Sequence, residues 1–134
     1  MIKRITHICD IGCYSRCHAA NIQLEKLSLI YGENCYGKST LCDIIRSLAD
    51  DNPIYITGRK TIPAIESGGQ RVQLKVLYPD NTQETSINFR NGSWEPKLTS
   101  VLNLEVFDSD FIYRNVSTGL TFQRENYENI TRFV

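Results

Sequence analysis

Runs of apolar residues alternate with polar stretches along the chain and predict two strands in its first part. Residues 2–11 are expected to form a strand that ends at Gly12. A second strand is predicted over residues 24–31, because a nearly continuous apolar run is typical of a buried strand covered on both faces. The apolar residues of that run are Leu27, Leu29, Ile30 and Tyr31.

A helix is predicted over residues 38–49. Its apolar residues recur at helical spacing and form one stripe along the helix. The sequence Asp51-Asn52-Pro53 is a stop signal for that helix. The stripe consists of Leu41, Ile44, Ile45 and Leu48.

The middle of the chain has the pattern of an antiparallel β meander. Residues 71–78 alternate polar and apolar side chains, and residues 83–90 are expected to form the returning strand. Asn91-Gly92 is a strong hairpin signal. A further strand is predicted over residues 102–107, and the polar tail from Gln123 is expected to be helical or frayed.

Length and composition narrow the class of protein. The 134 residues fit one domain, and the hydrophobic fraction of 41% permits a core of useful size. The 15 basic and 15 acidic residues balance, so the composition lacks the overall excess of positive charge that is typical of nucleic-acid-binding proteins. Neither a signal peptide nor an apolar run of the roughly 18 residues that span a membrane is apparent. We therefore expect a cytoplasmic protein without a membrane partner.

The candidate chemistry lies between the second predicted strand and the helix. The pattern G-x-x-x-x-G-K-[ST] is matched in full by residues 32–39. Its predicted flanks, a buried strand before and an amphipathic helix after, are those of a phosphate-binding P-loop. The expected nucleotide-binding residues are Gly32, Glu33, Asn34, Cys35, Tyr36, Gly37, Lys38, Ser39 and Thr40.

Each part of this pattern has a physical task. Backbone N–H groups of the loop and of the first helical turn point at anionic phosphates. Lys38 places a positive charge on the β- and γ-phosphates, and the Ser39 hydroxyl is a ligand for nucleotide-bound Mg²⁺. The expected cofactors are therefore ATP and Mg²⁺. Two alternatives stay open: an accidental glycine-rich turn, and a degenerate P-loop that keeps the fold but binds nucleotide poorly.

These residues resemble a known family. Residues 29–34, running into Gly37-Lys38-Ser39-Thr40-Leu41, look like the P-loop of ABC-type ATPases related to SMC and RecF proteins. Residues 105–112, followed by Asn115-Val116, look like the segment after the β meander in the AAA_13 group. That group includes the ATPase parts of the RloC and PrrC anticodon nucleases, which act in phage defence.

The resemblance implies an α/β P-loop fold, the N-terminal lobe of an ABC ATPase, with an antiparallel β subdomain. Residues 1–52 would supply strands, P-loop and helix, and residues 53–134 the β subdomain and a Q-loop-like region. An ABC signature, a Walker B strand and a switch histidine are absent from the sequence. The chain therefore resembles the first half of a head, which needs a C-terminal half or partner chain. Head-to-head dimerisation, and nucleic-acid contacts through other parts, are implied for the full-length protein.

The sequence departs from the family pattern at two places. Cys35 stands where the family usually has glycine. Asp108 and Asp110 lie where a Q-loop glutamine is usual, so Asp108 is a candidate metal contact, with loop capping as the alternative.

Residues near the first strand offer further candidates. In related heads the turn after this strand approaches the nucleotide, so Tyr14 is a candidate for stacking on adenine and Arg16 for touching phosphate; a plain surface turn is the alternative. A zinc site is the other hypothesis for this stretch, although its spacing is not a recognised ligand pattern. An odd number of cysteines favours free thiols. The residues concerned are His7, Cys9, Cys13, Cys17 and His18.

The sequence thus predicts the ATP-binding half of an ABC-type ATPase head that does not hydrolyse ATP alone. A non-catalytic interaction module on a degenerate P-loop scaffold is the main alternative. A small P-loop kinase is a third, which the β meander after the helix disfavours, because such kinases continue with βα units.

Overall fold

The computed structural model describes residues 1–19, 22–64, 68–78, 83–97, 104–107 and 111–113. The chain divides into two compact units, Met1–Leu104 and Glu105–Val134, and each is described by itself. In the second unit, residues 111–113 form a short helical turn, and the rings of Phe107 and Phe111 lie 5.0 Å apart.

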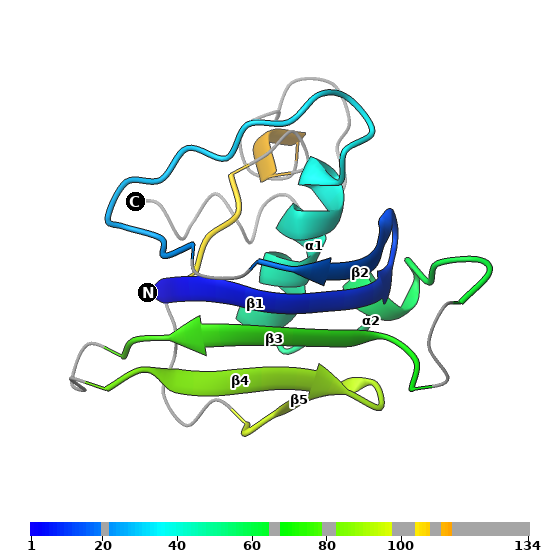
Figure 1. Ribbon diagram of the computed structural model, residues 1–134. Coiled ribbons are helices and arrows are strands. Elements are labelled where there is room, and N and C mark those ends of the chain that lie inside the picture. Colours follow the sequence, from blue (N-terminus) through cyan, green and yellow to red (C-terminus); the bar gives the residue numbers. More distant parts are fainter. Residues whose placement is uncertain (20–21, 65–67, 79–82, 98–103, 108–110, 114–134) are drawn as a thin grey trace, which may run out of the picture. The chain divides into compact units, whose positions relative to one another are not determined.

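The first unit is built on a five-stranded antiparallel sheet with the strand order β2-β1-β3-β4-β5 (Figure 1). Strands β1 and β3 are neighbours in the sheet but lie far apart in the sequence, with both helices between them. The strands are β1 (Ile2–Ile11), β2 (Tyr14–His18), β3 (Arg71–Val76), β4 (Thr85–Arg90) and β5 (Ser93–Glu95).

Strict alternation in β3 and β4 gives the sheet one apolar face. Every second residue of these strands is buried, and the intervening residues are polar. The antiparallel register places Val72 opposite Ile8 of β1 and opposite Phe89 of β4, so apolar side chains meet on one face. The core is completed by further residues of β1, β3, β4 and β5 and by residues of both helices: Ile11, Leu74, Val76, Ile87, Trp94, Ile44, Leu48 and Ile56.

Helix α1 (Lys38–Ala49) covers the apolar face of the sheet (Figure 1). The predicted bounds of this helix are confirmed, and Ile44 and Leu48 of its predicted stripe are fully buried. A buried hydrogen bond reinforces the packing, because the indole N–H of Trp94 donates to Ser47 Oγ at 3.1 Å. The short helix α2 (Ile54–Thr57), which the sequence did not predict, packs beside α1.

The hairpin between β4 and β5 follows the sequence signal. Asn91 and Gly92 both have left-handed backbones, with φ of 53° and 79°, as a tight two-residue hairpin turn requires. Tyr14, Ser15 and Arg16, which were expected in a turn, instead belong to β2 and pair with β1 at the edge of the sheet. Residues 104–107 form no strand, and residues 102–103 lie outside the described part of the chain.

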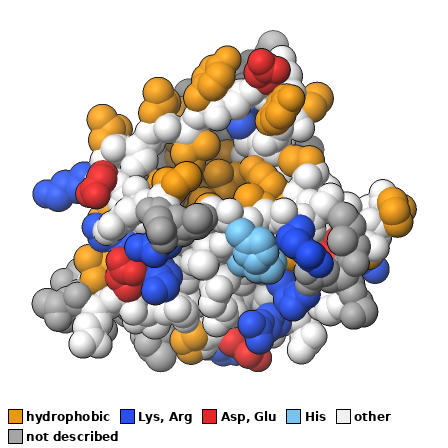
Figure 2. Space-filling model, in the orientation of Figure 1, with side chains coloured by type: hydrophobic (Ala, Val, Ile, Leu, Met, Phe, Trp, Pro, Cys, Tyr) orange, Lys and Arg blue, Asp and Glu red, His pale blue; other side chains and the backbone are white. Residues whose placement is uncertain are grey.

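The predicted strand over residues 24–31 was wrong. The structure describes this segment as irregular chain, held by a hydrogen bond from the amide of Leu24 to the carbonyl of Lys3 at 2.7 Å. A strand needs a neighbour to accept its backbone hydrogen bonds, and the segment pairs with neither edge strand of the described sheet. Its apolar side chains are accordingly exposed, with Leu27 at 93% and Leu29 at 95% (Figure 2).

Candidate nucleotide-binding site

The loop before α1 has the backbone that a phosphate loop needs at two positions. Gly37 is the residue before the helix and has φ of 88°. Cys35 is also left-handed, with φ of 69°, a conformation in which a non-glycine residue is strained. The first helical turn contains no acidic residue, and none of the side chains that the structure describes caps its N–H groups. Those N–H groups and the positive end of the helix dipole therefore remain available to an anion.

Lys38 folds back over the loop that precedes it. Its ammonium donates to the carbonyl of Gly32 at 2.6 Å and to the carbonyl of Glu33 at 2.7 Å. A third contact within the loop joins the amide of Tyr36 to the carbonyl of Glu33 at 3.3 Å. The lysine thereby holds the loop in a compact turn and keeps its charge beside the helix N-terminus.

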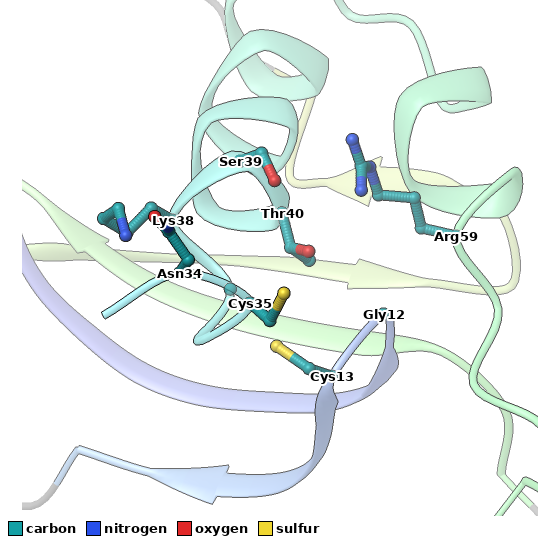
Figure 3. Close-up of a pocket in the computed structure, with 9 residues that line it drawn as sticks. Gly12, Cys13, Asn34, Cys35, Lys38, Ser39, Thr40 and Arg59 are labelled. Atoms are coloured by element: carbon teal, nitrogen blue, oxygen red, sulfur yellow. The ribbon is translucent and has the colours of Figure 1, made fainter. Parts of the chain in front are cut away.

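The loop opens onto a pocket of about 520 Å³ (Figure 3). That volume lies within the range of small-molecule and cofactor sites, roughly 300–1,000 Å³. Three parts of the chain surround it: the turn between β1 and β2, the P-loop with the start of α1, and the residue Arg59 after α2. The lining residues are Gly12, Cys13, Asn34, Cys35, Gly37, Lys38, Ser39, Thr40 and Arg59.

The turn between β1 and β2 is packed against the P-loop. A Cβ added to Gly37 would lie 2.6 Å from Cys13 Sγ and 2.7 Å from the Tyr14 hydroxyl, so a larger residue does not fit there. Gly12, with φ of 56°, is equally restricted, because its added Cβ would lie 2.7 Å from Thr40 Oγ1. Glycine is thus required at both points where the turn meets the loop and helix.

Gly12, Cys13 and Arg59 line the pocket although they were not among the predicted nucleotide-binding residues. Arg59 is the charged residue of the three. Its guanidinium is held by the carboxylate of Asp43 on α1, which also accepts from Arg46 at 2.8 Å. Figure 3 shows the Arg59 side chain on the same side of the pocket as Ser39 and Thr40. No motif marks an arginine after a short unpredicted helix, so only the fold brings it to the site.

The other predicted nucleotide-binding residues do not line the pocket. Gly32, Glu33 and Tyr36 belong to the loop but do not line the pocket. Tyr14 lies beneath the loop, with its hydroxyl donating to the carbonyl of Gly37 at 3.2 Å. Burial, as the main cause, raises the pKa of its phenol.

The remaining candidates are Arg16 and the aspartates of the Q-loop-like region. Arg16 pairs with Cys9, whose other neighbour across the sheet is Arg71, and is not among the pocket-lining residues. Asp108 and Asp110 lie outside the described residues.

The cysteines are free thiols, as the odd count predicted. Within the described residues, no group of three or more His, Cys, Asp and Glu side chains is arranged to hold a metal ion, so that part of the chain offers no zinc site. Cys13 and Cys35 are exposed, and their sulfur atoms point into the same part of the pocket (Figure 3).

Comparison with protein-family models, curated proteins and solved structures finds no match to this chain. Among the described residues, no helix has the length and apolar character needed to cross a membrane.

Proposed function

We propose that this chain binds ATP·Mg²⁺ through residues 32–39 and forms the ATP-binding half of an ABC-type ATPase head. The observation that carries the proposal is the uncapped N-terminus of α1, which opens onto a pocket of about 520 Å³ beside Lys38 and Ser39. A glycine-lined loop, a lysine and a hydroxyl at a helix N-terminus are the groups that bind nucleotide phosphates.

Phosphate binding requires Lys38 to change partners. Its ammonium bonds to the carbonyls of Gly32 and Glu33 and forms no ion pair with a carboxylate in the described part of the chain. Charge-assisted bonds to phosphate are stronger than bonds to neutral carbonyls, so phosphate competes well for the lysine. The exposed position of these bonds leaves the ammonium free to move. Arg59, already oriented by Asp43, adds a second cation at the same pocket.

The residues present fit a nucleotide-bound Mg²⁺ in one respect, the Ser39 hydroxyl in the pocket. When bound, the metal would neutralise charge on the phosphates. Ser39 would hold and orient it, while the amides of α1 hold the phosphate oxygens. The sequence has no Walker B strand or ABC signature, and the described residues that line the pocket include no carboxylate, so we expect little or no hydrolysis by the chain alone.

A second part of the head would explain the exposed apolar residues before the loop. Leu27, Leu29 and Tyr31 are each more than 80% exposed, although their pattern is that of a buried strand. We propose that strands of a C-terminal half or partner chain pair with residues 24–31 and cover them. The head-to-head dimer, the phage-defence role and the cytoplasmic location implied by the resemblance belong to this same proposal.

A non-catalytic scaffold with a degenerate P-loop is the alternative function. The left-handed Cys35 favours it, because a Cβ at a strained loop position is unfavourable where glycine is usual. If Cys35→Gly leaves phosphate binding unaltered, that result would argue against this alternative.

Nucleotide binding tests the two functions directly. ATP·Mg²⁺ should raise the thermal midpoint of the wild-type chain and leave that of Lys38→Ala unchanged, because ligands that bind only the folded state stabilise it. Lys26→Ala, at an exposed position outside the loop, is the matched control. No shift at millimolar ATP in the wild type would support the scaffold and reject the ATP-binding proposal.

A further inference from the structure

The face of the sheet opposite α1, here called the outer face, collects basic side chains from four strands. In β3 the residues that alternate with the buried ones are Arg71, Gln73 and Lys75. The register brings His7 of β1 opposite Gln73 and opposite His18 of β2. The outer-face cations and histidines are Arg4, His7, Arg16, His18, Arg71, Lys75 and Arg90.

The acidic groups on or beside the described strands are fewer than these basic groups. Asp10 of β1 is buried next to Cys9, which pairs with Arg16 and Arg71 across the sheet. Glu95 lies opposite Asn88 at the far edge of the sheet, and Glu84 lies 3.9 Å from the Lys75 ammonium. The outer face is therefore positive, although the whole chain has a formal net charge of zero. Figure 2 shows histidine side chains gathered with lysine and arginine side chains over the sheet.

A small cavity lies within this basic face. Its volume is about 50 Å³, and it is lined by His7, Arg71, Val72, Gln73, Asn88 and Arg90. The volume exceeds the roughly 30 Å³ share of one water molecule but is far below that of a nucleotide site. The cavity thus has room for one small group and not for a whole nucleotide.

Polar atoms are buried at this cavity without a protein partner. His7 Nε2 and Asn88 Oδ1 have no hydrogen-bond partner among the described residues, although both atoms are shielded from solvent. Buried polar groups in native proteins are almost always hydrogen-bonded. Both side chains can present an N–H donor there, because a neutral imidazole donates from one of its nitrogens and the Asn88 carboxamide donates from its nitrogen when the amide is turned over.

The electrostatics around His7 agree with this arrangement. Burial is the main cause that lowers the pKa of His7, and His18, Arg71, Arg16 and Arg90 lower it further. All four of those neighbours are cations or become cations, so the surroundings of His7 favour an added negative charge.

We propose that the cavity formed by His7, Arg71, Asn88 and Arg90 on the outer face binds a single phosphate group. Arginine guanidinium groups recognise phosphate through paired N–H donors. Arg16 and Arg90 are exposed at the rim, where they would meet either a free phosphate or the next group of a polynucleotide backbone. This site is separate from the P-loop and does not depend on ATP binding there.

Nuclear magnetic resonance tests the site by its own residues. Inorganic phosphate added to the Lys38→Ala chain should shift the side-chain signals of His7 and Asn88, and the P-loop variant removes competition from the first pocket. In Arg90→Gln, about tenfold more phosphate should be needed to produce the same shifts, because one charge-assisted contact is lost. Lys26→Gln, which removes an equal charge from an exposed residue elsewhere, should leave them unchanged.

A second arm identifies the source of the phosphate. A fluorescent single-stranded oligonucleotide is titrated by anisotropy at several salt concentrations, because backbone binding weakens steeply as salt rises. Tighter binding than inorganic phosphate, lost in Arg90→Gln, assigns a polynucleotide backbone; binding of inorganic phosphate alone assigns a free anion. Absence of shifts at His7 and Asn88 with both ligands, or equal shifts in wild type and Arg90→Gln, overturns the proposal.

Discussion

Tyr14 supports Gly37 from below: the phenol of β2 donates to the glycine carbonyl at 3.2 Å, across 23 positions in the sequence. Cys13 Sγ lies equally close to the space where a side chain of residue 37 would stand. The P-loop is therefore shaped both by its own sequence and by the β1–β2 turn beneath it.

Gly37→Ala should disrupt the loop more than its backbone strain alone predicts. Residue 37 combines φ of 88° with the close approach of Cys13 and Tyr14. Gly69→Ala is the matched control, because Gly69 has φ of 67° and no atom within 4 Å of an added Cβ. Both changes should lower the free energy of unfolding by about 1–2 kcal/mol through left-handed strain.

The two glycine variants should differ in their affinity for ATP and in the size of their loss of stability. Only Gly37→Ala should lower ATP affinity in calorimetry, and its loss of stability should exceed that of Gly69→Ala. Equal stability losses and equal affinities would mean that the turn does not constrain the loop.

Lys38→Ala should remove most nucleotide binding and leave the fold intact. The lysine ammonium contacts exposed loop carbonyls and no core residue. A charge-assisted hydrogen bond contributes about 1.5–3 kcal/mol, so calorimetry should show at least about tenfold weaker ATP binding. Circular dichroism checks the fold, and unchanged affinity would place the nucleotide elsewhere.

Cys35→Gly should strengthen ATP binding. Residue 35 has φ of 69°, and strain of a non-glycine residue in that region costs on the order of 1–3 kcal/mol. Glycine would relieve the strain and let the backbone approach the phosphates without a Cβ. Affinities are compared in reductant, so that thiol oxidation plays no part. Cys35→Ala, which removes the same sulfur but keeps a Cβ at the left-handed position, controls for the loss of sulfur.

Stability should fall as the pH is lowered below about 6.5, the ordinary pKa of histidine. Burial first, and then the cations His18, Arg71, Arg16 and Arg90, lower the pKa of His7 in the folded protein. The unfolded chain consequently binds the proton at a higher pH than the folded one, and protonation favours unfolding. The decline should continue until the pH reaches the lowered pKa of His7, below which His7 adds no further slope.

Urea unfolding midpoints at pH 7.5, 6.5 and 5.5 measure this decline. His7→Gln should flatten it, whereas Lys26→Gln should leave it unchanged. A decline of the same size in His7→Gln would show that other groups cause it.

Local patterns predicted the elements whose partners are near in sequence or whose periodicity is strict. Ile44 and Leu48 of the predicted α1 stripe are buried, whereas Leu41 and Ile45 are only partly buried, and Asn91-Gly92 forms the turn that its residue types demand. Alternation likewise predicted β3 and β4, because period-two burial is visible in the residues themselves. For the site, the motif predicted nucleotide binding by Lys38, Ser39 and Thr40; the three residues line the pocket, and their nucleotide binding stays a prediction.

Other features depend on neighbours that local sequence does not reveal. Residues 24–31 have the apolar run of a buried strand, but burial also needs a partner strand, which the described sheet does not supply. Arg59 reaches the pocket through its pairing with Asp43, 16 positions away. The basic outer face arises from strand register across four strands, and a balanced composition conceals it.

Trp94 is the single tryptophan of the chain, 2% exposed, with its indole bonded to Ser47 on α1. Its fluorescence therefore reports on one event, the docking of the helix against the hairpin. A red shift in emission would mark the loss of that contact, since the indole would then meet water. Ligands that occupy the pocket without moving the body of α1 should leave the emission maximum unchanged. The chain thus carries an intrinsic optical probe of helix docking that is separate from any probe of its binding sites.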